Sequence, residues 1–512
     1  MSITKLRNNS ARYMKVGLWL FVIIFVASIP FWNSGTGSRT NNKLEQSNDV
    51  IATVNGKDIK NGDFLERYTA QKEMYKKVGG MNAIQDAQLR GEILSQLINE
   101  QIVISAAEKK GISVGWGELR RERNKLIDAR VDQEKQIAGG KGRKLTDNEF
   151  DRLLRQSSPS KTLGQFRKEI ANELTKDKVR NYIMINKLEA QLKSSVGNID
   201  DQRLTDNFRQ LKVSHIVILS NKAPEQAQRK AEEVQKKLKA GEDFAKMAAQ
   251  FSDDPTSKSK GGDLGFMPVA GDKDLQGLKV GQTSGIIKLP YGYRIVKVED
   301  SKLELPKDFD KNKNKYRDQL TSQLQSEALR EFFDTAQKSA KIEVRNPEFN
   351  GYWIARKAMN SMDMDERTKL FKQALQSLDK ATKDENSDNS SLLPAYAEKV
   401  VIYQMTGEGK KAIDVLVDIM DNKQLTDTPE LRMMLAELYI QNGEKEKAVP
   451  NLKIASEEAY DAQTHVRLKS MYESIGHPEL AAVETKWMKA NPELMSKLNN
   501  ASKENAPIKL KK

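Results

Sequence analysis

The stretch of residues 211–300 constrains the fold of this chain most strongly. It opens with an apolar run over 211–219 in which alternate residues share one face, a period that predicts a β-strand. A helix is expected to begin at Pro224 and to end at Gly241, because proline suits a first helical turn and glycine suits the position after the last one. A second strand is predicted over 293–298. The order of strand, helices, loop and strand predicts a compact α+β domain.

Three blocks inside this stretch carry a family resemblance. They read Val-Ser-His215-Ile-Val, then Asp253-Asp254-Pro followed by Gly-Gly-Asp-Leu264-Gly, and lastly Tyr291-Gly-Tyr-Arg-Ile. In this order they resemble the parvulins, which are peptidyl-prolyl cis-trans isomerases. Isomerisation is slow without catalysis because the imide bond has partial double-bond character. A protein site accelerates it by excluding water, gripping the proline ring and stabilising the twisted imide, so the resemblance implies no cofactor and no metal.

The resemblance also implies roles for individual residues. His215 matches the first of two central histidines, and Asp254 matches the acidic residue beside it, which makes these two the candidate catalytic residues. The candidate substrate-binding residues around the proline pocket are Leu264, Phe266, Met267, Tyr293 and Arg294. A structural interpretation stays open for both catalytic candidates: His215 as a hydrogen-bonded core histidine, and Asp254 as a residue that forms the turn before a proline.

Two departures from the parvulin pattern concern activity. Arg294 stands where the family has its second histidine, and the stretch between Phe266 and Gly281 is short and lacks the family's proline-clamping methionine and phenylalanine. We therefore expect a parvulin fold with weak or absent isomerase activity. Strand alternation turns Arg294 inward, and a buried arginine needs a partner, so we also predict an ion pair between Arg294 and Asp254.

The amino-terminal segment predicts a membrane anchor. A basic stretch over 1–15 precedes an uncharged apolar run over 16–32, which is at the short end of the roughly 17–25 residues that a spanning helix needs. Cations before the run keep the amino end in the cytoplasm, so the bulk of the chain is expected in the periplasm of a bacterium, held by one span in the inner membrane. Residues 33–48 are expected to form a flexible tether. A cleaved signal peptide is the alternative.

The next part of the chain predicts a hairpin followed by helices. Asn55 and Gly56 suit a tight turn between two short strands, and a helix is predicted over 91–110 from its apolar stripe. Another helix is expected near Thr162. The highly charged residues 118–150 are interpreted as a mobile basic loop between helices.

A second resemblance covers these elements. Three segments of the sequence resemble the chaperone domain of the SurA, PpiD and PrsA group. They are Val54-Asn-Gly-Lys-Asp-Ile, Gln96-Leu-Ile-Asn-Glu-Gln-Ile and Thr162-Leu-Gly-Gln-Phe-Arg. The resemblance implies a mainly helical chaperone domain over 49–205, completed by a returning helix and strand within 306–345. The parvulin-like domain over 210–300 is then an insertion. An apolar cradle for unfolded segments is the implied role, and ordinary helix cores are the alternative interpretation of the same stripes.

The carboxyl-terminal third contains an internal repeat. Tyrosine, glycine and alanine recur at the same spacing around Gly407, Gly443 and Gly476, and 443 − 407 = 36 while 476 − 443 = 33. A period near 34 resembles tetratricopeptide repeats, so an α-solenoid is predicted over 360–495. Such arrays present a groove for a partner protein, although a plain helical packing domain is the alternative. The lysine-rich tail over 497–512 is expected to be disordered.

Length and composition narrow the function further. A chain of 512 residues is expected to form about three domains. The absence of cysteine excludes disulfides and thiolate catalysis. The net charge of +14 has two interpretations, general solubility or attraction to an anionic membrane and acidic clients, and no nucleic-acid motif is present. The predicted function is a membrane-anchored periplasmic folding factor for unfolded, newly exported proteins. The alternative is a non-catalytic scaffold that docks partners on the parvulin and repeat domains.

Overall fold

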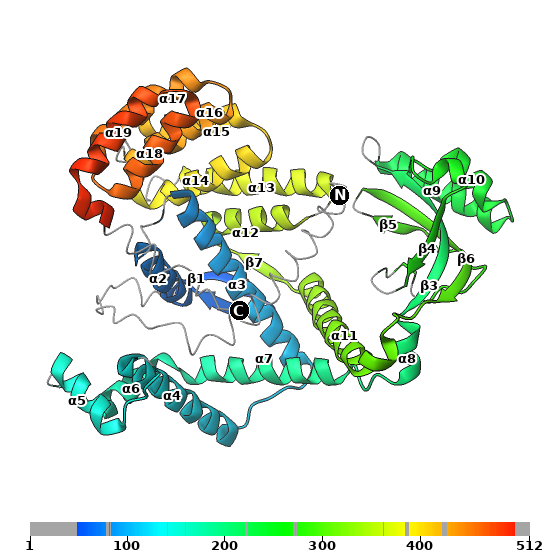
Figure 1. Cartoon of the computed structure of the whole chain (residues 1–512), viewed down its shortest axis with the longest axis horizontal. Helices are drawn as coiled ribbons and strands as arrows, with labels where there is room; N and C mark the ends of the chain where they lie inside the picture. Colours follow the sequence, from blue (N-terminus) through cyan, green and yellow to red (C-terminus); the bar gives the residue numbers. More distant parts are fainter. Residues whose placement is uncertain are drawn as a thin grey trace. The chain divides into compact units, whose positions relative to one another are not determined.

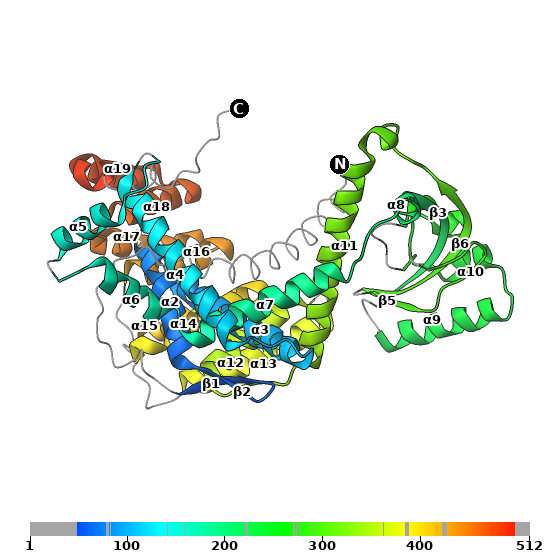
Figure 2. The ribbon, with the colours of Figure 1, turned by 90° about the horizontal axis from the view of Figure 1, so that it is seen from below.

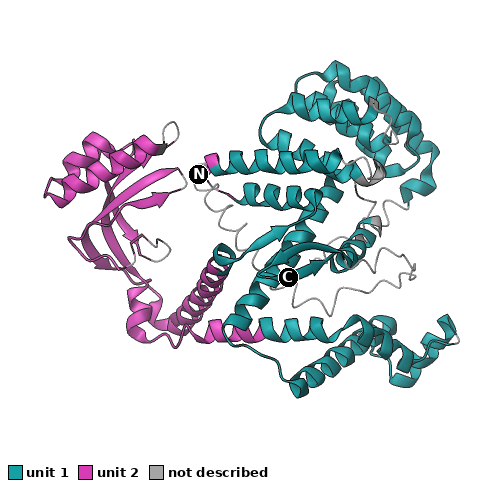
Figure 3. Cartoon of the chain, turned by 180° about the vertical axis from the view of Figure 1, so that it is seen from behind, with its two compact units in different colours: residues 1–185, 336–360, 366–512 teal, residues 186–335, 361–365 magenta. Residues whose placement is uncertain are grey.

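The structure of the protein is a computed structural model that describes residues 49–496, except 78–80, 82, 141, 159, 221–223, 270–271, 273, 276, 290, 362, 384–388 and 422–427. It divides into two compact units (Figure 3), residues 1–185, 336–360 and 366–512 in one and residues 186–335 and 361–365 in the other. The predicted tail over 1–15, anchor over 16–32, tether over 33–48 and basic tail over 497–512 lie outside the described residues. Among the helices that are described, none is long and apolar enough to cross a membrane.

A small antiparallel sheet in the first unit joins the two sides of the inserted segment. Asn55 and Gly56 both have positive φ, 51° and 82°, which confirms the predicted turn. The amide of Asn55 donates to the carbonyl of Lys341 at 2.8 Å, and the amide of Lys341 donates back to the Asn55 side chain at 3.0 Å. The predicted returning helix and strand are confirmed. The elements are β1 (Val50–Val54), β2 (Lys57–Lys60), α11 (Phe309–Ser339) and β7 (Ile342–Val344), and the sheet order is β2-β1-β7.

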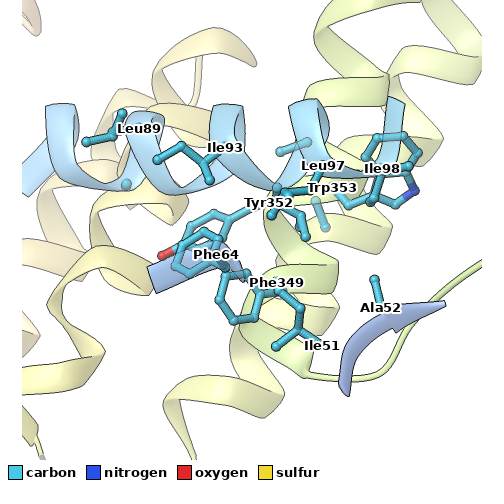
Figure 4. Close-up of a cluster of buried hydrophobic side chains, with 14 of the residues drawn as sticks. Ile51, Ala52, Phe64, Leu89, Ile93, Leu97, Ile98, Phe349, Tyr352 and Trp353 are labelled. Atoms are coloured by element: carbon cyan, nitrogen blue, oxygen red, sulfur yellow. The ribbon is translucent and has the colours of Figure 1, made fainter. Parts of the chain in front are cut away.

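The main core of the first unit lies between helices from both sides of the insertion. Figure 4 shows aromatic side chains of α2 and α12 packed beneath the apolar stripe of α3. Phe64 and Phe349 meet edge to face with ring centroids 4.6 Å apart, and Tyr352 is fully buried beside them. The same core extends to α14. The helices involved are α2 (Asn61–Lys77), α3 (Ala83–Lys109), α12 (Pro347–Asn360), α13 (Met364–Thr382) and α14 (Asn389–Met405).

Residues 118–139 and 147–150 of the charged stretch are helical, so the interpretation of 118–150 as one mobile loop is wrong for these residues. Leu119, Leu126 and Val131 lie on one side of α4 and are buried against Ile170 and other apolar side chains of α6 and α7. Most of the charged side chains of α4 are exposed or half-buried, although Arg130 and Lys135 are buried. A high charge content therefore concealed a regular amphipathic helix. The helix expected near Thr162 is confirmed. The elements are α4 (Trp116–Gly139), α5 (Asp147–Ser157), α6 (Leu163–Glu173) and α7 (Lys176–Ser194).

The second unit contains the predicted compact α+β domain. Its antiparallel sheet has the strand order β4-β3-β6-β5, and α9 and α10 cover one face of it (Figures 1 and 2). Ile216, Ile218 and Ile295 point into that covered face. The helix predicted to begin at Pro224 does so. The elements are α8 (Asp201–Asp206), β3 (Arg209–Leu219), α9 (Pro224–Lys239), α10 (Phe244–Phe251), the 3-10 turn η3 (Lys258–Lys260), β4 (Asp263–Pro268), β5 (Ile287–Leu289) and β6 (Gly292–Leu303).

The carboxyl-terminal segment forms successive helices that pack on their neighbours (Figure 1). Gly407, Gly443 and Gly476 have positive φ and lie in the turns that follow α14, α16 and α18, as the repeat spacing predicted. The remaining helices are α15 (Gly409–Asp421), α16 (Pro429–Gln441), α17 (Lys445–Glu458), α18 (Ala462–Ile475) and α19 (Pro478–Ala490). Their membership of the tetratricopeptide class, and the domain boundary at residue 360, stay predictions.

A buried polar cluster holds the last helices together. Nδ1 of His465 lies 2.5 Å from a carboxylate oxygen of Glu484, and Ser456 donates to the other oxygen at 2.6 Å. The indole ring of Trp487 stacks on the His465 ring, with centroids 3.5 Å apart. Both His465 and Glu484 are 1% exposed, so α17, α18 and α19 share a buried hydrogen-bond network.

We predict that Glu484→Ala destabilises these helices by about 3–5 kcal/mol, because it leaves a buried polar partner without its carboxylate. Urea unfolding followed by hydrogen exchange in α18 and α19 measures the change. Glu479→Ala is the matched control, since Glu479 also contacts a histidine, His477 at 2.8 Å, but its side chain is 64% exposed. The control is expected to cost at most about 1 kcal/mol. Equal losses in the two variants would contradict the prediction.

Candidate functional site

The central strands β3 and β6 set the geometry of the candidate site. Their antiparallel register pairs His215 with Val296 and Val217 with Arg294. Cross-strand partners, and residues two apart on one strand, share a face of a sheet. His215 and Arg294 therefore project from the same face, opposite the face that α9 and α10 cover. The side chain of each is 12% exposed.

A hydrogen-bonded cluster surrounds His215. Its Nε2 lies 2.9 Å from Oδ2 of Asp254 and 3.0 Å from the hydroxyl of Ser257. The Ser257 hydroxyl donates to the same Asp254 oxygen. The hydroxyl of Thr256 lies 2.9 Å from both oxygens of Asp254, and the Thr256 amide donates to Oδ1 at 3.2 Å. The Asp254 carboxylate is thus fully engaged with neighbours in its own loop and with the strand histidine.

The loop after α10 is aligned along β3 by further hydrogen bonds. The amide of Asp253 donates to the carbonyl of Val217 at 2.7 Å, and the amide of His215 donates to the carbonyl of Gly262 at 2.9 Å. Gly262 has φ +87°, and a Cβ at this position would lie 2.4 Å from the carbonyl oxygen of His215. Only glycine fits so close to the strand, which explains why the loop returns through paired glycines.

The surroundings of His215 and Asp254 determine the protonation state of each side chain. Burial acts to raise the pKa of Asp254, but hydrogen bonds from Ser257, His215 and Thr256 outweigh it and hold that pKa well below its ordinary value. Burial lowers the pKa of His215, and the positive charge of Arg294 lowers it further, against the opposing effect of Asp254. At neutral pH a neutral His215 donates its Nε2 proton toward an ionised Asp254.

Serine, histidine and aspartate lie together here, but their geometry is not that of a hydrolase. In a catalytic triad the serine and the carboxylate bond opposite nitrogens of the imidazole. Here Ser257 and Asp254 share one nitrogen of His215, and Ser257 is only 1% exposed. The cluster orients the imidazole and does not activate a nucleophile.

The predicted ion pair between Arg294 and Asp254 is wrong. Nη1 of Arg294 instead lies 3.1 Å from a carboxylate oxygen of Asp272 and 3.2 Å from one of Asp274. Asp254 is saturated by donors from its own loop, so the buried guanidinium takes its partners from the segment after β4. Arg294 thus has the acidic partners that a buried guanidinium needs, but they are Asp272 and Asp274 rather than Asp254.

The predicted pocket residues divide between the two faces of the sheet. Tyr293 packs in the cluster beneath α9 and α10, so the structure does not bring it to the face that carries His215. Leu264 is partly buried, while Phe266 is 38% exposed and lies under the ammonium group of Lys302, 4.7 Å from its ring centroid. Met267 alone of the predicted wall residues joins the apolar cluster on the His215 face. That cluster consists of Leu211, Val213, Leu275, Val296 and Val298, with Met267, Val269, Leu278 and Ile287 at its edge.

Sequence reasoning missed four residues of this site: Ser257, Asp272, Asp274 and Leu275. A hydroxyl three residues after Asp254 was a usable signal for Ser257, since short loops of this kind bond their own side chains. No local pattern marked the other three. Within the described ranges, no group of three or more histidine, aspartate or glutamate side chains is arranged to hold a metal ion.

Comparison with known families adds two matches. Residues 200–302 match the family described as the PPIC-type PPIASE domain, and residues 3–172 match the family described as the SurA-like N-terminal domain. The first match contains the candidate site around His215 and Arg294, and the second covers the first part of the larger unit.

Similar proteins are named foldases. The chain is 30% identical over 215 residues to the foldase protein PrsA of a Geobacillus species, covering 40% of this chain and 74% of that protein. It is 25% identical over 350 residues to the foldase protein PrsA of Caldanaerobacter subterraneus subsp. tengcongensis, covering 64% and 95%. The solved structure of the peptidylprolyl isomerase PrsA from Bacillus anthracis is 27% identical and covers 41% and 98%, with a TM-score of 0.19, which is too low to bear on the arrangement of this chain.

The low pKa of His215 gives a testable prediction. We expect its imidazole to titrate below the ordinary histidine value of about 6.5, because burial and Arg294 disfavour its charged form. Asp254→Asn is expected to move the midpoint still lower, since it removes an opposing carboxylate. Histidine-selective NMR on the whole chain measures both, because the protein has three histidines. His477→Gln identifies one of the other signals. A midpoint above 6.5 contradicts the prediction.

The lowered pKa of His215 also determines how the contribution of this residue to stability changes with pH. The unfolded chain takes up a proton at residue 215 near its ordinary value of about 6.5, whereas the folded domain takes it up only at lower pH. The contribution of His215 to stability is therefore present above that pH and is lost as the pH falls toward the folded pKa. Asp254, whose pKa is also depressed, acts in the same direction at more acidic pH.

Proposed function

Because the chain belongs to the family of foldases that join a SurA-like N-terminal domain to a PPIC-type peptidyl-prolyl isomerase domain, we propose that it binds unfolded polypeptides and assists their folding. The observation that carries this proposal is the presence of both family domains in one chain, together with a His215–Asp254 pair on the sheet face of the isomerase domain. The relatives named above are foldases by name, which supports the same assignment.

Exposed apolar side chains on the helical part of the first unit supply candidate contacts for an unfolded client. Trp116 at the start of α4 is 68% exposed, Ile137 near its end is 57% exposed, and Leu153 on α5 is 42% exposed. A client's own apolar segments gain free energy by leaving water against such residues. Neighbouring cations, such as Arg120 over the Trp116 ring, favour clients that also carry acidic residues.

The isomerase site is proposed to be weak. His215 is neutral and hydrogen-bonded, and an apolar face lies next to it, as an X-Pro bond requires when it is twisted away from water. Arg294 stands in place of a second histidine and is tied to two aspartates, so the side chain is not free to face a substrate. Leu264, Phe266 and Met267 remain the candidate walls for the proline ring.

We further propose the setting in which the protein acts. The uncharged run over 16–32 is interpreted as a single membrane span, with the bulk of the chain in the periplasm where newly exported proteins are unfolded. The helices over 360–495 are proposed as a tetratricopeptide-like array that docks a partner protein. The chaperone domain over 49–205 and 306–345 and the isomerase domain over 210–300 are the proposed functional boundaries.

A scaffold without catalysis is the second candidate function. The specific observation in its favour is the Arg294 pairing with Asp272 and Asp274, which engages the position of the second histidine. In that case the parvulin-like and helical domains bind defined partners, and unfolded proteins in general are not clients.

An aggregation assay tests the chaperone role. We expect the full chain to suppress light scattering of a reporter protein diluted from denaturant. Replacing Trp116 and Leu153 together by serine is expected to weaken the suppression several-fold, because a client that covers each exposed side chain only partly gains a fraction of the roughly 1.5–3 kcal/mol that full burial supplies. Tyr460→Ser is the control, since Tyr460 is 85% exposed but precedes α18 in the carboxyl-terminal helices. Absence of any suppression by the unaltered chain favours the scaffold.

A protease-coupled isomerase assay on an Ala-Pro-Phe peptide tests catalysis. We expect a low but measurable rate, and a loss of roughly tenfold or more in His215→Ala, at the lower end of what a positioned polar group contributes. A rate that does not exceed the uncatalysed one assigns the domain to binding alone. An equal rate in His215→Ala and the unaltered chain shows that His215 has only a structural role.

A further inference from the structure

The face of the sheet that carries His215 is already covered by the protein itself. Leu275 is 0% exposed and packs against Val213, Val296 and other strand residues of the apolar cluster defined above. Val213 lies two residues before His215 on β3, and Val296 is the cross-strand partner of His215 on β6. Leu275 thus lies on the apolar surface immediately beside the histidine.

A short turn carries Leu275 to this position. The amide of Leu275 donates to the carbonyl of Asp272 at 3.1 Å, and the amide of Asp274 donates to the Asp272 side chain at 3.0 Å. The amide of Leu278 bonds back to the carbonyl of Leu275 at 3.3 Å. These hydrogen bonds form a local turn. They do not by themselves hold the turn against the sheet, so another contact is needed.

Arg294 supplies the attachment. Its guanidinium reaches Asp272 and Asp274, which both belong to this turn, through one nitrogen, Nη1. The Arg294 side chain is 12% exposed and the two aspartates are 22% and 26% exposed, so the three charges are largely withdrawn from water. Nε of Arg294 is buried and has no hydrogen-bond partner. A buried guanidinium cannot lose both carboxylates without a large cost, so the attachment is strong.

We propose that Arg294 is a positioning residue that, through Asp272 and Asp274, keeps Leu275 pressed onto the apolar face beside His215 and so limits access of a proline-containing peptide to that face. The residue that stands in place of a second histidine then has a role of its own: it sets how often the face is open. This inference rests on the proposed function, because it concerns a peptide that binds at the His215 face.

The arrangement has a quantitative consequence. The apparent affinity of a site that is open for only part of the time is reduced by the fraction of time it is open. Weakening the attachment or shortening the covering side chain raises that fraction. Peptide affinity and KM should therefore respond. Because Arg294 also lowers the pKa of His215, kcat is compared at alkaline pH, where His215 is neutral in every variant, and there it should change little.

The test measures binding and turnover of a fluorescent Ala-Pro-Phe peptide by the full chain and by the variants named below. Leu275→Ala and Arg294→Ala are expected to bind the peptide about tenfold more tightly, with a matching fall in KM and little change in kcat. The variant carrying both Asp272→Asn and Asp274→Asn is expected to behave like Arg294→Ala. Combining it with Arg294→Ala should add nothing further, because all three residues act through one contact.

Arg229→Ala is the matched control, since Arg229 lies on α9 of the same domain in an exposed pair with Glu225 at 3.9 Å. It should change neither affinity nor KM. Hydrogen exchange at the amides of Leu275 and Leu278 gives a second readout, and faster exchange is expected in Arg294→Ala but not in Arg229→Ala. If Arg294→Ala does not fold, the inference is tested by the peptide affinity of Leu275→Ala, because this variant keeps the ion pairs of Arg294.

Two results overturn the inference. One is unchanged peptide affinity in folded Leu275→Ala, and the other is tighter binding that appears equally in Arg229→Ala. Failure of the proposed function is a separate outcome, because it appears as an absence of aggregation suppression in the unaltered chain. Intact suppression with unchanged peptide affinity in all variants rejects the role of Arg294 alone.

Discussion

The larger unit depends on the packing of segments that lie far apart in the sequence into one apolar core. Phe64 comes before the inserted segment and Phe349 and Tyr352 come after it, yet their rings pack together beneath α3. The backbone hydrogen bonds between Asn55 and Lys341 close the inserted segment at its base. Because neither side of the insertion has this core alone, the segment between them must fold with its ends brought together.

The same core also reaches the carboxyl-terminal helices. α14 packs on α3 through Ala395, Ala397 and Ile402, and Arg356 bonds the fully buried Glu398 at 3.3 Å. The guanidinium of Arg356 occupies the space that a side chain at Gly91 would need, since a Cβ there would lie 2.9 Å from its Nε. The carboxyl-terminal helices that follow α14 are therefore continuous with the core around α3.

In the smaller unit, hydrogen-bond saturation decides which charges pair. Asp254 receives its donors from Ser257, Thr256 and His215. It has no need of a guanidinium, and its pKa lies low without one. Arg294 is left to neutralise its buried charge elsewhere, and it does so with Asp272 and Asp274, in the segment that contains Leu275. Arg294 therefore acts in two ways: its charge lowers the pKa of His215, and its ion pairs hold a segment that packs on the same face of the sheet.

The sequence alone determined the features that depend on neighbours along the chain. The Asn55–Gly56 turn, the strand around His215, the helix from Pro224 and the turns at the repeat glycines follow from backbone preferences and apolar periodicity, which act over a few residues. Tertiary structure alone decided the partner of Arg294, the face on which Tyr293 lies and the helical state of residues 118–139. Each of these depends on which distant side chains lie near enough to satisfy a charge or cover an apolar stripe, and only the folded chain brings them together.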